Sequence, residues 1–271
     1  MNVLSPEVER RRRLVTRALP LSVVAVFAFA WGASTGAGGS PEKDVAARFA
    51  AAWERKDFDA MYRELNAASR QAVAAKEFAA AYRETAEVAT LRGLAFDDPD
   101  DPARRGGATV VPVATAADTV SFGRVEADLE LPVADGGVAW DPSLVFPGLQ
   151  RGEHLESRVE LAPRAAILAV DRTPLAEGPA VAREHPIGSA AIDVSGEVGT
   201  AQEEDLPLLA RHGFPPGTPV GVSGIEQAFN TRLAGKPGGT LLAVGDSGGS
   251  ARILAEAKPR PGAPVKTTID P

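Results

Sequence analysis

Residues 221–244 read GVSGIEQAFNTRLAGKPGGTLLAV and place a helix, a turn and a strand in immediate succession. Gly235 is a typical helix terminator, and Pro237 keeps the helix from continuing. The apolar run over 239–244 then predicts a strand. Three apolar residues recur every four positions, which places them on one face of the predicted helix: Ile225, Phe229 and Leu233.

A second strand is predicted over 251–257, so the segment GDSGG (245–249) lies between two strands. This pentapeptide matches the nucleophile motif of trypsin-like proteases and the G-x-S-x-G elbow of the α/β-hydrolases. Catalysis by Ser247 needs a histidine base, and no histidine follows Ser247 as the hydrolase order requires. We therefore expect Ser247 at a hairpin tip, with a serine hydrolase as the alternative. The histidines stand in contexts unlike that of a protease: His154, His185 and His212.

The residues before this hairpin predict further short elements. The segment AILAVDRTPLAEG (166–178) predicts a β-hairpin around the polar turn DRTP. Three leucines predict a short helix that ends at Gly213: Leu206, Leu208 and Leu209.

The first half of the chain changes from a helical to a strand pattern. Three apolar stripes predict three helices between residues 41 and about 88. The β-branched segments 108–115, 119–134 and 136–146 then predict a curved antiparallel sheet, so the fold class is α+β. The stripes are Val45, Phe49, Ala52 and Trp53; then Phe58, Met61 and Leu65; then Val73, Phe78 and Tyr82. The aromatic residues are expected to fill a core, with an open pocket as the alternative.

Ser40-x-x-Lys43 matches the nucleophile motif of penicillin-binding enzymes and serine β-lactamases. The companion motifs S-x-N and K-[ST]-G occur nowhere in the chain. A helix start accounts for the same residues, because Ser40 is a good N-cap and Pro41 suits the first helical position. Glu42 and the acid after Lys43 also suit the positive end of a helix dipole. We therefore expect Ser40 to cap a helix.

An apolar, uncharged run from Ala18 to Ala33 follows five arginines, at positions 10–13 and 17. Basic residues stay on the cytoplasmic side, and Trp31 suits the membrane interface. The run predicts an N-terminal membrane helix with the rest of the chain outside the cytoplasm; a signal peptide cleaved near Ala28-Phe29-Ala30 is the alternative.

Composition excludes several classes of function. The chain has 271 residues, a net charge of -7 and no cysteine. The negative charge argues against nucleic acid as the main partner, and the lack of cysteine excludes disulfides and cysteine-based metal sites. No catalytic, cofactor-binding or metal-binding residue is predicted. The acidic residues Asp97, Asp98, Asp100 and Asp101 lack the spacing of a Ca²⁺ loop and predict a solvated linker.

In order along the chain, these stretches resemble the non-catalytic N-terminal part of class B penicillin-binding proteins. Residues 49–70 and 137–153 resemble the membrane-proximal domain of the methicillin-resistance-type subgroup, which has the cone fold of nuclear transport factor two. Residues 161–178 and 221–244 resemble the dimerisation domain, and 263–271 resemble the segment that leads into the transpeptidase domain. Pro163, Arg164, Asp171 and Arg172 match the family motif, whereas Ala165 and Thr173-Pro174 stand where glycines are usual.

The resemblance implies a stalk that places a transpeptidase above the membrane and contacts other wall-synthesis or division proteins. The chain ends where the transpeptidase domain would begin, so we expect it to be no enzyme by itself. An exported cone-fold module that binds a ligand or partner is the alternative, and the oligomeric state is not predicted. The implied segments are a basic tail (1–17), a membrane anchor (18–35), a linker (36–40), a cone-fold domain (41–150), a dimerisation-type domain (151–255) and a second linker (256–271).

Overall fold

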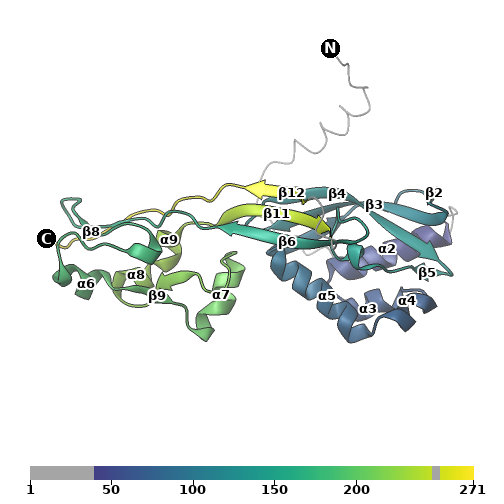
Figure 1. Cartoon of the computed structure of the whole chain (residues 1–271), viewed down its shortest axis with the longest axis horizontal. Helices are drawn as coiled ribbons and strands as arrows, with labels where there is room; N and C mark the ends of the chain where they lie inside the picture. Colours follow the sequence, from purple (N-terminus) through teal and green to yellow (C-terminus); the bar gives the residue numbers. More distant parts are fainter. Residues whose placement is uncertain (1–39, 246–250) are drawn as a thin grey trace, which may run out of the picture. The chain divides into compact units, whose positions relative to one another are not determined.

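The computed structural model describes residues 40–245 and 251–271, which fold as a mixed α+β unit (Figure 1). The predicted membrane helix at 18–35 and the turn with Ser247 lie outside these residues. Within the described ranges, none of the helices has both the length and the hydropathy that a membrane crossing needs.

The first helix within the described residues, α2 (Pro41–Glu54), begins where the sequence predicts. The Ser40 hydroxyl oxygen accepts a hydrogen bond from the backbone N–H of Lys43 at 3.3 Å, and Pro41 occupies the first turn. Because the first N–H groups of a helix have no partner within it, this bond satisfies one of them. The predicted apolar face of α2 is buried.

Residues 58–88 form three further helices where two were predicted: α3 (Phe58–Arg63), α4 (Ala67–Ala72) and α5 (Ala75–Val88). The additional helix is α4. It starts because the Asn66 side chain accepts a hydrogen bond from the backbone N–H of Ser69 at 2.8 Å. It ends at Val73, whose backbone is extended.

An antiparallel sheet follows over residues 91–138, with the order β1-β3-β4-β5 and β2 beside β3. Helices α2 to α5 lie along one face of this sheet (Figure 1). Of the segment predicted as a strand over 136–146, only the first residues pair; the 3₁₀ helix η1 (Pro142–Val145) follows. Strands β1 and β2 were not predicted. The strands are β1 (Leu91–Phe96), β2 (Ala103–Arg105), β3 (Ala108–Thr119), β4 (Arg124–Ala134) and β5 (Gly137–Val138).

Aromatic rings fill the space between these helices and the sheet. Phe49, Trp53, Phe78 and Tyr82 are all at most 3% exposed. The ring centroids of Trp53 and Tyr82 lie 4.9 Å apart, and those of Phe78 and Tyr82 lie 4.8 Å apart. The Tyr82 hydroxyl accepts a hydrogen bond from the Trp140 indole at 3.2 Å, so its polar atom is satisfied inside the core.

A second antiparallel sheet has the order β12-β11-β6. Strands β11 (Gly238–Gly245) and β12 (Arg252–Ala257) are the two predicted around the Ser247 segment, and β6 (Glu153–Glu160) was not predicted. Leu155 and Leu241 from this sheet share an apolar cluster with Phe122 and Phe146.

The remaining residues form the second lobe, defined here as residues 161–235 and 258–271. The predicted hairpin is present as β7 and β8, and Arg172 takes the turn position with φ 75°. The segment predicted as a linker from residue 256 contributes β13, which pairs in parallel with β7. The lobe contains β7 (Ile167–Leu168), β8 (Pro174–Ala176), α6 (Ser189–Ser195), β9 (Val198–Thr200), η3 (Glu203–Asp205), α7 (Leu206–Arg211), β10 (Pro219–Gly221), α8 (Gly224–Ala228), α9 (Asn230–Ala234) and β13 (Val265–Lys266).

The single helix predicted across 225–233 is wrong, because the structure has two short helices there, α8 and α9. The break falls at Phe229, whose φ of -114° and ψ of 22° leave the helical region. Phe229 is therefore 43% exposed, whereas Leu233 is fully buried. Gly235, with φ 72°, ends α9 as predicted.

Candidate functional site

The Ser40-x-x-Lys43 motif does not form a nucleophile and base. The Ser40 hydroxyl oxygen caps α2, and the Lys43 ammonium lies 3.3 Å from the Asp101 carboxylate. Lys43 is thus paired with the acidic segment 97–101, whose Asp101 side chain is 96% exposed. The motif marks a helix start.

The histidines contact unrelated groups. The His154 Nε2 atom lies 3.2 Å from the Glu156 carboxylate, and His212 is exposed at the end of α7. In the part of the chain that the structure describes, no group of three or more metal-ligating side chains could hold an ion.

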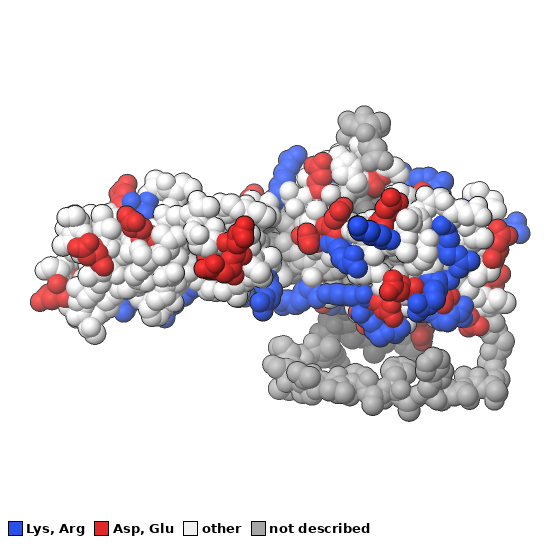
Figure 2. Space-filling view, turned by 90° about the horizontal axis from the view of Figure 1, so that it is seen from below, with Lys and Arg blue, Asp and Glu red and all other residues white. Residues whose placement is uncertain are grey.

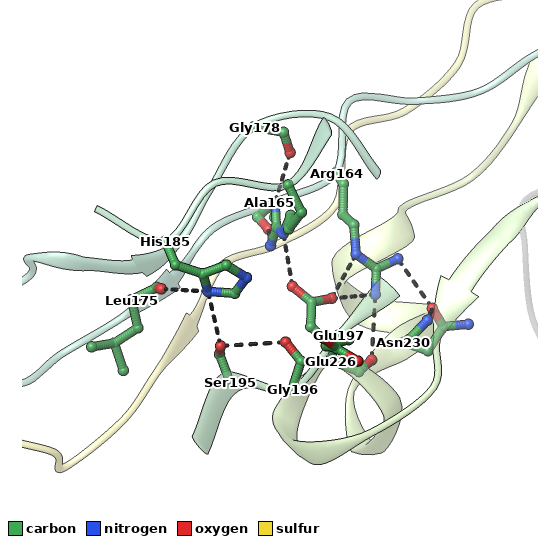
Figure 3. Close-up of polar contacts among 12 residues, drawn as sticks. Arg164, Ala165, Leu175, Gly178, His185, Ser195, Gly196, Glu197, Glu226 and Asn230 are labelled. Atoms are coloured by element: carbon green, nitrogen blue, oxygen red, sulfur yellow. Dashed lines mark hydrogen bonds and ion pairs between the residues drawn. The ribbon is translucent and has the colours of Figure 1, made fainter. Parts of the chain in front are cut away.

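His185 approaches a serine that sequence analysis did not single out. Its Nδ1 atom lies 3.1 Å from the Leu175 carbonyl oxygen and 3.2 Å from the Ser195 hydroxyl (Figure 3). A carbonyl oxygen only accepts, so the contact with Leu175 requires a hydrogen on Nδ1. The buried Ser195 hydroxyl donates instead to the Ala191 carbonyl at 2.7 Å. Nδ1 therefore cannot take the proton of Ser195, and the pair does not form a nucleophile and base.

A buried ionic cluster lies at the centre of the second lobe. The Glu226 side chain is fully buried, and its two carboxylate oxygens accept hydrogen bonds from two different arginines. The Nε atom of Arg164 donates to one oxygen at 2.7 Å, and the Nε atom of Arg183 donates to the other at 2.7 Å. Both arginine side chains are at most 5% exposed. We call these three residues the ionic cluster.

The arginines also bind backbone carbonyls. Arg183 donates to the carbonyls of Gly178 at 2.7 Å and of Ala165 at 2.6 Å. Burial lowers the pKa of the Arg164 guanidinium, and the charge of Glu226 opposes that decrease. Buried charges are tolerated when they are paired and fully hydrogen-bonded, as they are here.

The ionic cluster fixes the break between α8 and α9. The side-chain oxygen of Asn230 accepts from Arg164 at 3.0 Å and from the backbone N–H of Gly221 at 3.0 Å. Asn230 therefore links β10, α9 and the cluster. Because Asn230 is the first residue of α9, the adjacent Phe229 is held at the break.

A groove of about 400 Å³ lies between α7, β10 and the break. We call it the α7–α9 groove. Its apolar lining comes from Leu208, Leu209, Val220 and Phe229, and the charged residues Asp205 and Arg232 also line it. The lining contains no serine, cysteine or histidine. The polar part of the lining includes Thr231, Asn230 and Gln227.

Most of these residues were not predicted from the sequence. Arg164 was noted only through a family resemblance, and Glu226, Arg183 and Asn230 were not noted at all. An acid beside the apolar residues of a predicted helix was the available signal at Glu226, but its partners are about 40 and 60 positions away.

The fold defines a mixed α+β protein with a curved, helix-covered sheet in its first part and a separate apolar core in its second lobe. Residues 41–153 match the family model of the NTF2-like N-terminal transpeptidase domain, and residues 162–267 match that of the penicillin-binding protein dimerisation domain. The chain therefore carries both of these domains, one after the other. No curated protein matches it.

Proposed function

We propose that this chain is a membrane-anchored, non-catalytic stalk of the penicillin-binding-protein type, acting in peptidoglycan synthesis outside the cytoplasm. The observation that carries the proposal is the pair of consecutive domain matches over 41–153 and 162–267. Both families describe the non-catalytic parts of such proteins. The physical role of a stalk is to hold a transpeptidase at a set height and to offer surfaces to other proteins.

The hydroxyl groups described above support a non-catalytic role. The Ser40 oxygen is engaged as a helix cap, and Ser195 is buried and donates to a backbone carbonyl. A penicillin-reactive serine needs an exposed hydroxyl next to a proton acceptor. A fluorescent penicillin should therefore leave the purified 271-residue chain unlabelled, while a complete penicillin-binding protein in the same assay is labelled. Covalent labelling of this chain would overturn the proposal.

The anchoring part of the proposal rests on the apolar run 18–33 and the arginines before it. The absence of cysteine allows a direct test, because single cysteines can be introduced without background. Glu54→Cys, on the exposed surface of α2, should react with a membrane-impermeant maleimide in intact cells. Ser5→Cys should react only after the membrane is permeabilised. The opposite pattern would contradict the proposed topology.

A further inference from the structure

Two exposed apolar side chains line the α7–α9 groove. Leu208 is 49% exposed and Phe229 is 43% exposed, and both line the groove. Leu206, the first residue of α7, is 39% exposed and lies outside the lining. Single exposed apolar residues are ordinary on protein surfaces, but Leu208 and Phe229 share one concave site and together offer an apolar surface on which another chain can dock.

The groove is held in shape by buried contacts. Asn230 receives hydrogen bonds from Arg164 and Gly221, and Arg164 is bound to the buried Glu226. Leu209 and Val220 form the floor and are at most 6% exposed. The hydrogen bonds of Asn230 hold the backbone break in place, and Phe229 therefore stays at the groove. A preformed apolar site loses little freedom when it binds.

The charges around the groove indicate what could occupy it. Three consecutive acids, Glu203, Glu204 and Asp205, make up η3 directly before α7, and Asp205 lines the groove. On the α9 side, Arg232 lines the groove and donates to the Pro264 carbonyl at 3.0 Å. The lining itself carries one carboxylate, of Asp205, and one guanidinium, of Arg232; the exposed carboxylates of Glu203 and Glu204 precede Asp205 in η3 and add to the acidic side. The face drawn in Figure 2 carries both acidic and basic side chains.

We propose that the α7–α9 groove binds an apolar segment of another protein that carries lysine or arginine where it passes η3. The apolar side chains would cover Leu208 and Phe229, and the basic residues would face Glu203 and Glu204. Charge complementarity of this kind sets the orientation of a partner and speeds association. The acidic side disfavours nucleic acid and anionic lipid. The proposal deepens the proposed function, on which it rests, by naming a partner surface of the stalk.

The test uses the full chain in detergent and two labelled amphipathic peptides with the same leucines, one with lysines and one with glutamates. Binding is followed by fluorescence anisotropy. We expect the lysine peptide to bind about tenfold more tightly than the glutamate peptide, and Phe229→Asp to weaken its binding by about tenfold. The double variant Glu203→Lys, Glu204→Lys should remove the preference for lysine. Added salt should weaken the lysine peptide's binding.

Ile253→Asp is the matched control, because Ile253 is 60% exposed on β12 and does not line the groove. Ile253→Asp should leave binding unchanged. Because peptide that enters the detergent micelles contributes equally with every variant, the comparison with Ile253→Asp removes that contribution. Circular dichroism checks that Phe229→Asp is folded, and the η3 double variant changes only exposed residues. Equal binding of both peptides, no binding, or insensitivity to both groove variants would overturn the proposal.

Sedimentation distinguishes a second copy of this chain as the occupant. If Phe229→Asp converts a dimer into a monomer, the groove binds its own chain and the proposed partner is wrong. These outcomes are separate from the penicillin and maleimide tests, which do not depend on the groove. If the peptides fail to bind as expected while the maleimide test gives the expected topology, only the proposed partner surface is refuted.

Discussion

At the residue scale, Glu226 receives hydrogen bonds from two arginines that are far from it in sequence. Its removal would leave two guanidinium groups buried without a counter-charge. Breaking a buried pair on one side costs far more than replacing the whole pair with apolar groups. The ionic cluster is therefore a point of high sensitivity for the second lobe.

We predict that Glu226→Gln lowers the free energy of unfolding of the second lobe by about 3–5 kcal/mol. The amide keeps the size of the side chain but cancels its charge, which isolates the electrostatic effect. Hydrogen exchange of the amides in α8 and α9 measures the change. Glu204→Gln, on the exposed surface of η3, is the control and should change exchange little. Similar effects of the two variants would contradict the role given to the cluster.

Asp171 gives a prediction about pH. The backbone N–H of Thr173 donates to its carboxylate at 2.8 Å, and the Thr173 hydroxyl donates at 2.9 Å. These bonds lower the pKa of Asp171 below its ordinary value of 3.8. The stabilisation is thus present above pH 3.8 and is lost as the pH falls through the lowered pKa.

Thr173→Val removes the hydroxyl donor and keeps the backbone donor, so it should raise the pKa of Asp171 part of the way toward the ordinary value. An NMR titration of the Asp171 carboxyl carbon measures the pKa in both proteins. Thr268→Val, on an exposed residue outside the turn, should leave the titration of Asp171 unchanged. An unchanged pKa in Thr173→Val would show that the hydroxyl does not stabilise the carboxylate.

The residues that sequence analysis identified correctly depend on local rules. Ser40 was predicted to cap a helix because capping is decided within one turn of chain. Gly235 was predicted to end a helix because the residue after a helix often has a positive φ, which glycine adopts more easily than residues with a side chain. Arg183 and Asn230 were missed because their partners come from other elements, which no local pattern reports.

At the element scale, the start of α2 distinguishes a helix cap from a catalytic motif. Ser40→Ala should lower the stability of the first domain by about 1 kcal/mol, because the backbone N–H of Lys43 loses its side-chain acceptor and keeps only the Ser40 carbonyl. Thermal unfolding followed by circular dichroism measures the loss. Ser40→Asp restores an acceptor and should recover most of it. If Ser40→Ala were as stable as the unchanged protein, the capping role would be contradicted.

Long periodic elements were predictable and short ones were not. The stripe from Val45 to Trp53 is buried as expected, because a helix of this length shows its period clearly. The break at Phe229 was missed because the apolar spacing continues across it. What interrupts the helix is the hydrogen bonding of Asn230, and that depends on tertiary structure. Strand β6 was missed because its alternating charged residues resemble a loop.

At the scale of the whole molecule, two phenylalanines can be compared, one in a core and one on the proposed binding surface. Phe78 is fully buried in the first core and Phe229 is 43% exposed. Phe78→Ala should cost about 3–5 kcal/mol of stability, because it leaves a cavity among aromatic rings. Phe229→Ala should cost no more than about 0.5 kcal/mol, as other surface substitutions do. Scanning calorimetry measures both; equal costs would mean that Phe229 is part of a core.

The pairing of β13 with β7 affects the order in which the second lobe can fold. The Thr267 hydroxyl donates to the Leu168 carbonyl across 99 positions of sequence. Contacts between distant residues form slowly, because a long loop must close before they are made. While the chain emerges from the ribosome, β7 cannot pair with β13 until residues 265–267 have appeared. Until then its edge stays open to wrong pairings, so a chaperone that delays early collapse would increase the yield of folded chain.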